Sequence, residues 1–442
     1  MTRGVLAIVA ALSILPVLPI LPADRVEREF DVAETGDALI TVIAGCARCD
    51  WGETGREAAV LRVSLDGEYS QHVVIARGET AVEYPIALGR VAKGRHRLTI
   101  DRDTDLSARG AGPATIDTSE VTVRHPGDAD FQALSLAPII YARANTVGKF
   151  TDVPMLMWYE VETTPRGTRY RYSVVFSNED GGTETDRLMA TWGRTTDIEF
   201  VYGVELDGSG RILAEEFQGP GHEVPAFTGR HEAGHPLLWV STDNNMVSES
   251  GSTRIRYAPA AEKFDLANQS REAVMDAHPW TYAVSSVEMR REGKTADDPP
   301  PGHNTIPDPR RFVYVEACGT IGDAAIALSI GTAGQSKGEM TWTPSDRGLP
   351  RYRVVRDGCF RIATPVPRGT RPADLRAIRV NAYERPRPNN APPARPAGPV
   401  TMTRINKVFM LDAHDLPGPS VFRWTGAATL RPGGEPLEVR IP

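Results

Sequence analysis

Short stretches in which apolar and polar residues alternate dominate the chain between residues 26 and 125. The stretch 63–65 leads through Asp66-Gly67 into the apolar run 72–76, and residues 95–100 alternate polar and apolar positions. Alternation with a period of two is typical of strands with one buried face, and Asp-Gly turns are typical of hairpins. Evenly spaced strands of this kind predict a small antiparallel β-sandwich module over residues 24–126.

A second, larger β-rich module is predicted after the turn-forming segment 126–130. Strand-like runs follow at 136–141, 155–161, 170–177, 198–206, 237–241, 254–257, 313–330 and 352–363. A partial apolar face predicts one helix over 260–275, whereas the Pro-rich segments 299–301 and 386–399 are predicted loops. The expected fold class is mainly β: antiparallel β-sandwich or jelly-roll modules, a small one followed by a larger one at 131–442. A further subdivision near residue 300 stays open.

The first 23 residues have the layout of a secretory signal. Arg3 precedes an apolar run from Gly4 to Leu21, and the small Ala23 comes directly before charged sequence. Three prolines, and a length short of the roughly 20 residues that span a bilayer, argue against a membrane anchor. No later segment is long and apolar enough for a stable membrane span. We therefore expect residues 1–23 to be removed and the mature protein to be secreted or periplasmic.

Charge and cysteine content narrow the classes of function. The chain has 50 Lys and Arg against 57 Asp and Glu, a formal net charge of −7, which argues against a nucleic-acid partner. An even number of cysteines in an exported protein predicts disulfides, and we expect Cys46 to pair with Cys49 and Cys318 with Cys359. A redox pair is the alternative for the first two, but such motifs usually open a helix after a parallel strand.

Candidate acidic and histidine side chains are most concentrated between residues 177 and 249. Asp197 and Glu199 are two residues apart on a predicted strand, so their side chains point to the same face. Two carboxylates on one face repel each other unless a cation, an arginine or a shared proton compensates. The pair therefore predicts either a divalent-metal site or a general acid/base pair, with a pair of acids that face solvent or Arg194 as the alternative. The predicted metal ligands are Asp197, Glu199, His222, His231, His235 and Asp243.

Residues 231–235 spell the H-E-x-x-H string of zinc metallopeptidases. In those enzymes a helix turns both imidazoles to one face and places the Glu beside a zinc-bound water. Here Pro236 biases His235 away from helical dihedrals, and residues 237–240 are predicted to form a buried strand. A zinc peptidase built on His231, Glu232 and His235 is therefore kept only as a second alternative.

The segment Gly193-Arg194-Thr195-Thr196-Asp197-Ile198-Glu199 resembles the G-H-R-H-D-W-E heptapeptide of necrosis-inducing cytolysins. It is also similar to the G-D-W-E of plant and fungal proteins named for a vacuolar sorting phenotype. The resemblance implies a β-sandwich and a cation site that helps to bind glycolipid headgroups, with Asp197 and Glu199 as the retained ligands. Both histidines and the Trp of the heptapeptide are replaced here. The N-terminal segment resembles sandwich modules appended to secreted polysaccharide-acting enzymes.

These observations predict an exported protein that binds or processes extracytoplasmic glycans through a cation-dependent site, with calcium or zinc as the cofactor. Asp197 and Glu199 are the predicted catalytic residues. The predicted substrate-binding residues are Glu179, Asp180, Arg194, Trp192, Trp239 and Trp280. The alternative is a non-catalytic protein that binds carbohydrate or another cell-envelope ligand by aromatic stacking. Its candidate platforms are Trp51, Trp192, Trp239 and Trp280.

Overall fold

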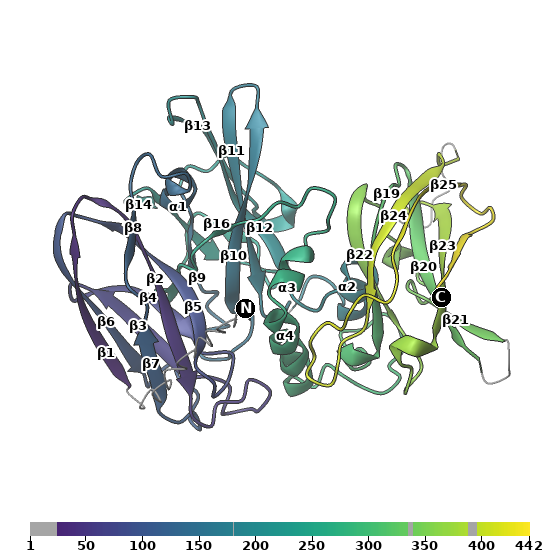
Figure 1. The fold of residues 1–442 in the computed structure, drawn as a ribbon, viewed down its shortest axis with the longest axis horizontal. Helices are drawn as coiled ribbons and strands as arrows, with labels where there is room; N and C mark the ends of the chain where they lie inside the picture. The colour runs from purple at the N-terminus through teal and green to yellow at the C-terminus, as the bar shows by residue number, and fades with distance from the viewer. Residues whose placement is uncertain (1–23, 180, 335–338, 388–395) are drawn as a thin grey trace, which may run out of the picture.

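The computed structural model describes residues 24–179, 181–334, 339–387 and 396–442. Antiparallel sheets dominate the molecule, which confirms the predicted fold class (Figure 1). No helix within these ranges is long and apolar enough to cross a membrane. The predicted signal segment, residues 1–23, lies outside the described residues.

The N-terminal region is a sandwich of two antiparallel sheets. One sheet has the order β1 (Arg25–Val32), β6 (Gly94–Asp103), β3 (Val60–Leu65) and β4 (Glu68–Val74). The other has the order β5 (Val82–Val91), β2 (Gly36–Cys46) and β7 (Ala114–Thr118), and β8 (Thr122–Arg124) also pairs with β2. The β3–β4 hairpin turns through Asp66 and Gly67, whose φ angles are +53° and +86°. Positive φ at both positions matches the twist of a two-residue hairpin, as the Asp-Gly pair predicted.

Two further sheets follow in the chain. The larger has the order β13 (Ile212–Phe217), β12 (Ile198–Leu206), β11 (Gly167–Phe176), β10 (Pro154–Thr164) and β18 (Glu262–Lys263). The smaller has the order β14 (His231–Glu232), β15 (His235–Val240), β9 (Ile139–Tyr141) and β17 (Arg256–Tyr257), with β16 (Val247–Ser248) beside β15. All nine residues of β12 are buried. The side chains of this strand are therefore largely shielded from water.

The helices are short and do not lie where the sequence pattern placed them. They are α1 (Phe131–Ser135), α2 (Thr185–Trp192), α3 (Ala273–Ala277) and α4 (Trp280–Arg291). The predicted helix at 260–275 is wrong: Glu262 and Lys263 pair with β10 as a strand, and helix α3 begins only at Ala273. Phe264, which contributed to the apparent helical face, packs against the hydrophobic cluster around Trp158 instead. Of the other residues that mimicked helical spacing, Ala261 is buried outside a helix, Ala267 is exposed and Val274 is buried on α3.

The C-terminal region is a second sandwich. One sheet has the order β22 (Gly358–Pro365), β19 (Phe312–Thr320), β24 (Val400–Phe409) and β25 (Trp424–Leu430). The other has the order β21 (Met340–Pro344), β20 (Ala324–Ala333), β23 (Leu375–Glu384) and β26 (Leu437–Arg440). The described residues also form 3-10 helices at Pro220–His222, Pro309–Arg311, Pro350–Tyr352 and Pro372–Asp374. One hydrophobic cluster consists entirely of side chains from residues 313–441. The domain boundaries near 126 and 300 stay predictions.

The two predicted disulfides are confirmed. Cys46 and Cys49 close the turn after β2, and Cys318 and Cys359 face each other across the paired strands β19 and β22. No helix begins at the Cys46–Cys49 pair, so this disulfide cross-links a loop and does not have the surroundings of a redox motif.

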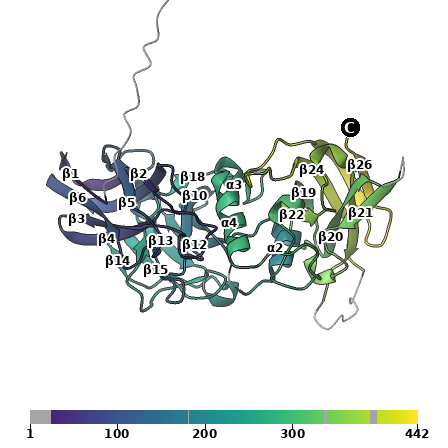
Figure 2. The same cartoon turned by 90° about the horizontal axis from the view of Figure 1, so that it is seen from below.

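The two sandwiches lie at opposite ends of the long axis, with α3 and α4 between the middle sheets and the C-terminal sandwich (Figures 1 and 2). Arg361 of β22 connects this junction. Its guanidinium is completely buried and bonds to Asp276 of α3 at 2.6 and 2.8 Å and to Glu316 of β19 at 2.7 Å. The same group also bonds to the Tyr282 hydroxyl of α4. A single side chain thus ties two helices to the C-terminal sheet.

Replacing Arg361 by Met should therefore destabilise the protein strongly. The variant leaves Glu316 buried without its cation, and Asp276 keeps only Lys407 as a cationic partner, at 3.3 Å. Removing one partner of a buried ion pair costs about 3–5 kcal/mol. Urea denaturation followed by fluorescence measures the change. Arg368→Met is the matched control, because Arg368 and its partner Asp297 are each more than three-quarters exposed and exposed pairs contribute little. Equal midpoints for the two variants would contradict the assigned role.

Candidate functional site

A cavity of about 320 Å³ opens where β11 and β12 meet the loops that follow β13 and β15. It collects a set of side chains that the sequence analysis singled out separately. These are Glu179, Trp192, Arg194, Asp197, Glu199 and His222. Four further polar residues line it: Thr183, Gln218, Asn244 and Arg271. The cavity is the place in the described structure where the predicted acids come together.

A tight turn after α2 delivers Arg194 and Asp197 to this cavity. Helix α2 ends at Gly193, whose φ is +62° and whose N–H donates to the Leu188 and Met189 carbonyls. A Cβ at this position would lie 2.5 Å from Cγ of Arg361. Glycine is therefore required both for the left-handed conformation and for the close approach of β22. The chain then reverses direction and enters β12, which places Asp197 and Glu199 in the protein interior.

Asp197 and Glu199 form a carboxyl pair at the beginning of β12. Asp197 is 1 % exposed and Glu199 is 7 % exposed, and the two carboxyl groups hydrogen bond to each other. Asn245 Nδ2 donates to Asp197 Oδ2 at 3.2 Å, and the Gln218 amide donates to Glu199. Each member of the pair thus has an amide partner in addition to the other carboxyl group. The alternative placed the pair against solvent or against Arg194: the solvent-facing arrangement is wrong, because both groups are buried, whereas Arg194 does lie beside Asp197.

Guanidinium groups and a shared proton compensate for the buried negative charge. Arg194 Nη1 lies 3.6 Å from Asp197 Oδ1, while its Nε donates to Glu272 at 3.1 Å. Burial raises the pKa of Asp197 well above its usual value, and the neighbouring charge of Glu199 raises it further. Burial also raises the pKa of Glu199, against the opposing effect of the Arg271 cation. We infer that Asp197 carries the shared proton and donates it to Glu199.

Glu179 is a third acid in the same cavity. Its side chain is 5 % exposed, and Oε1 accepts from the Thr183 N–H at 3.0 Å. Burial, together with the charge of Asp197, raises the pKa of Glu179 to about 8. At neutral pH this carboxyl is therefore mostly protonated, which suits a group that donates a proton. Its neighbour Asp180 lies outside the described residues.

Trp192 and His222 line the same cavity. The Trp192 ring lies beside two guanidinium groups, 5.8 Å from Arg187 and 5.4 Å from Arg356. His222 is exposed, has a φ of +62°, and its Nδ1 lies 3.4 Å from Nε2 of Gln218. The cavity thus combines a buried acidic floor with an aromatic ring and an exposed imidazole.

The H-E-x-x-H string forms a β-hairpin and not a helix. Glu232 pairs with His235 across a turn at Ala233 and Gly234. His231 Nε2 lies 2.7 Å from Glu215 Oε1, whereas His235 is buried with Nδ1 2.9 Å from the Ala137 carbonyl and Nε2 3.1 Å from Asp37 Oδ1. The two imidazoles have separate partners and share no ligand site. The zinc peptidase alternative is therefore wrong.

The predicted metal ligands do not form one cluster. Asp243 is largely exposed and pairs with Arg143, and the two hairpin histidines lie outside the cavity that holds Asp197 and Glu199. Among the residues that the structure describes, no group of three or more His, Cys, Asp and Glu side chains is arranged to hold a metal ion. The positive charge beside the carboxyl pair comes from Arg194 and Arg271 instead.

Three of the four tryptophans predicted as stacking platforms have other roles. Trp239 is buried and stacks on Tyr141 with a centroid distance of 4.4 Å. Trp51 is also buried, and its Nε1 donates to Glu288 at 2.9 Å. Trp280 lines a different cavity, next to the N-terminal sandwich. Packing has used the faces of Trp51 and Trp239, whereas Trp192 lines the site with its ring beside two guanidinium groups.

Sequence reasoning missed Gln218, Asn244 and Arg271. Gln218 follows β13, and Asn244 belongs to the polar loop before β16, so a polar residue directly after a strand was the available signal. Arg271 comes from a segment 72 positions after Glu199. Nothing in its local sequence separates it from the other arginines of this Arg-rich chain.

No protein-family model and no curated protein sequence matches this chain. Several solved structures are similar to parts of it, among them the following two. One is NLPPya in complex with mannosamine, with 14% identity over 35% of this chain and 81% of that chain and a TM-score of 0.25. The other is a ruminal GH26 endo-beta-1,4-mannanase, with 16% identity over 27% of this chain and 21% of that chain and a TM-score of 0.18. At these TM-scores neither similarity carries an argument about fold or function, and the cytolysin resemblance stays a prediction.

The raised pKa of Glu179 predicts a specific change in the pH dependence of stability. Because the folded protein holds this proton up to about pH 8 and the unfolded chain releases it near 4.5, Glu179 destabilises the fold progressively as the pH rises between these values. Glu179→Gln removes this effect. Relative to wild type, the variant should gain roughly 3 kcal/mol in unfolding free energy between pH 5 and pH 8. Urea denaturation at both pH values measures it, and a constant difference would contradict the assignment.

Proposed function

We propose that the cavity around Glu179, Asp197 and Glu199 binds a sugar unit of an extracytoplasmic glycan and hydrolyses its glycosidic bond. The observation that carries this proposal is that three buried carboxyl groups, those of Glu179, Asp197 and Glu199, line one cavity. Burial raises the pKa of each of them. When their surroundings give two carboxyl groups of one site different pKa values, one commonly acts as the acid and the other as the base.

The lining of the cavity suits a polyhydroxylated ligand. A sugar hydroxyl both donates and accepts hydrogen bonds, and the wall offers acceptors at Glu199, donors at Arg271, and both kinds at Gln218 and Asn244. Trp192 adds an apolar surface on which the C–H face of a sugar ring can lie. Binding sites of this kind combine an apolar wall with a few polar groups that orient the ligand.

The three carboxyl groups have separable tasks in such a reaction. Glu179 donates its proton to the glycosidic oxygen as the C–O bond breaks. Glu199, next to Arg271, accepts a proton from the attacking water, whose oxygen forms the new bond to the anomeric carbon. Asp197 holds Glu199 in place through the shared proton, so we regard it as a positioning group within the predicted catalytic pair. One proton leaves Glu179 and one arrives at Glu199, so the charges balance.

The calcium or zinc cofactor expected from the sequence stays a prediction. Arg194 and Arg271 already lie beside the carboxyl pair, so the proposed steps need no metal. Metal analysis of the mature protein, together with glycan binding before and after dialysis against a chelator, tests this point. Bound metal at near one equivalent, with binding lost on chelation, would make the cation part of the site.

The secreted or periplasmic location is supported by the two disulfides. Disulfides persist in oxidising compartments outside the cytoplasm and are rare inside it. A glycan or cell-envelope ligand is the partner class available there. Export of the full chain with removal of residues 1–23 is measured by N-terminal sequencing of the secreted protein.

The decisive experiment screens purified protein against a glycan panel for binding and for new reducing ends. Glu179→Gln should lose at least about 100-fold in kcat, the usual contribution of a general acid, while binding stays within a few-fold. Trp192→Ala should weaken binding about tenfold, a loss of about 1.4 kcal/mol. Glu162→Gln is the matched control, since Glu162 is a largely exposed acid on β10 outside the cavity.

The outcomes separate the enzyme from the binding protein. Glycan binding that depends on Trp192 but yields no product would support the non-catalytic alternative. Binding and turnover that are unchanged in both Glu179→Gln and Trp192→Ala would overturn the site. Turnover in wild type should also fall above about pH 8 as Glu179 loses its proton.

A further inference from the structure

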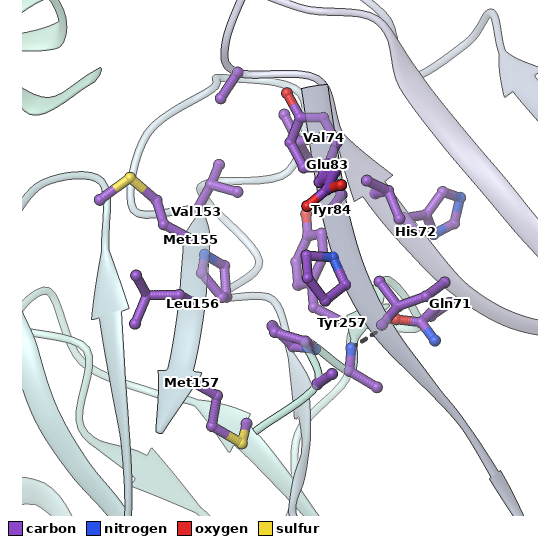
Figure 3. A pocket seen from close by; sticks show the side chains of 18 of the residues that line it. Gln71, His72, Val74, Glu83, Tyr84, Val153, Met155, Leu156, Met157 and Tyr257 are labelled. Atoms are coloured by element: carbon purple, nitrogen blue, oxygen red, sulfur yellow. Dashed lines mark hydrogen bonds between the residues drawn. The ribbon is translucent and has the colours of Figure 1, made fainter. Parts of the chain in front are cut away.

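A second cavity lies at the junction between the N-terminal sandwich and the middle sheets. Its volume is about 320 Å³, and its walls come from β4, β5, β10 and the segment 257–262. Figure 3 shows Met155, Leu156 and Met157 of β10 on one side and Tyr84 and Tyr257 on the other. Unlike the acidic cavity, this one is lined mainly by apolar and aromatic side chains. It shares no residue with the site described above.

Hydrogen bonds across the junction fix the spacing of the walls. The Ala87 N–H donates to the Ala258 carbonyl at 2.9 Å, and the Ala260 N–H donates to the Pro85 carbonyl at 3.0 Å. Gln71 adds a third hydrogen bond across this junction, because its Oε1 accepts from the Ala258 N–H at 2.9 Å. The two parts of the chain are thus joined beside the cavity. These hydrogen bonds therefore hold the walls of the cavity at a fixed separation.

Most polar groups in the lining are already used by the protein. Gln71 bonds at both ends of its amide, His72 lies between Tyr69 and Asp103, and His278 pairs with Glu262. Arg77 lies over the Trp280 ring at 4.7 Å. These contacts leave little polar capacity for a ligand with many hydroxyl groups.

Two tyrosine hydroxyls keep a proton to donate. The Tyr84 hydroxyl accepts from the Arg77 N–H at 3.3 Å, and its own hydrogen has no partner among the described residues. The structure gives the Tyr257 hydroxyl no hydrogen bond within those residues either. Burial raises the pKa of both phenols, so both stay protonated. The cavity therefore offers one or two hydrogen-bond donors in otherwise apolar surroundings.

Size and charge limit the ligand. An apolar cavity of about 150 Å³ is large enough to hold benzene, so the present volume fits on the order of twelve carbon atoms. Charges of both signs lie in the lining, with Arg77 next to Glu83 and His278 paired with Glu262. No single sign dominates, which favours a neutral headgroup. Methionine side chains adapt easily to flexible apolar chains.

We propose that this cavity binds a neutral amphiphile with a flexible alkyl chain of about ten to twelve carbons. The chain lies against Met155, Leu156 and Met157, and an ester or alcohol oxygen accepts a hydrogen bond from Tyr257 or Tyr84. The ligand occupies the junction of the N-terminal sandwich and the middle sheets, apart from the acidic cavity.

Fluorescence of N-phenyl-1-naphthylamine, a neutral apolar dye, tests the proposal on the full mature chain. We expect one saturable site, from which 1-decanol displaces the dye at least tenfold more effectively than decanoate or decylamine. Ala260→Phe places a ring in the cavity and should weaken dye binding at least tenfold. Val161→Phe is the matched control, because Val161 lies on the same strand β10 but is 41% exposed and outside the lining.

A second variant separates the hydrogen bond from the packing. Tyr257→Phe should weaken 1-decanol several-fold and leave dye binding unchanged, since the dye needs only the apolar wall. If Ala260→Phe does not fold, as judged by circular dichroism, Ala76→Phe fills the same cavity from another segment. Absence of saturable binding, wild-type dye affinity in a folded cavity-filling variant, or equal displacement by charged and neutral chains would overturn the proposal.

Discussion

Buried arginines set the main physical constraint on this β protein. Where sheets and helices meet, guanidinium groups such as those of Arg361 and Arg194 are withdrawn from water and paired with carboxylates. A desolvated charge is tolerated only when its partners surround it, and each partner is destabilised if the other is removed. The junctions therefore depend on matched sets of charges more than on apolar contact alone.

The chemistry of the acidic cavity follows from the same constraint. Arg194 already pairs with Glu272, so it compensates Asp197 only in part and at a longer distance. The remaining negative charge is reduced by protonation, because burial makes the ionised carboxyl expensive. Glu179 and Asp197 hold protons at a pH at which exposed acids would have lost them. Because the nearby arginines compensate these buried carboxyl groups only in part, Glu179 and Asp197 stay protonated and can donate protons.

The two large cavities divide polar and apolar recognition between different parts of the fold. The acidic cavity lies at the beginning of β12, where loops from five segments supply carboxyl, amide and guanidinium groups. The apolar cavity lies against the N-terminal sandwich, where the protein satisfies most of the polar lining itself. The first suits ligands with many hydroxyl groups, and the second suits alkyl chains.

Local sequence by itself determined most of the longer strands up to residue 365, the Asp66-Gly67 turn, the Cys46–Cys49 disulfide and the shared face of Asp197 and Glu199. Each of these depends on neighbours in the chain or on a period of two along a strand. Only the tertiary structure decided which acids are buried and which cations reach them. Arg271 meets Glu199 across 72 positions, and His235 finds Asp37 across 198. Burial and charge compensation depend on such distant partners, and a residue's local sequence does not reveal them.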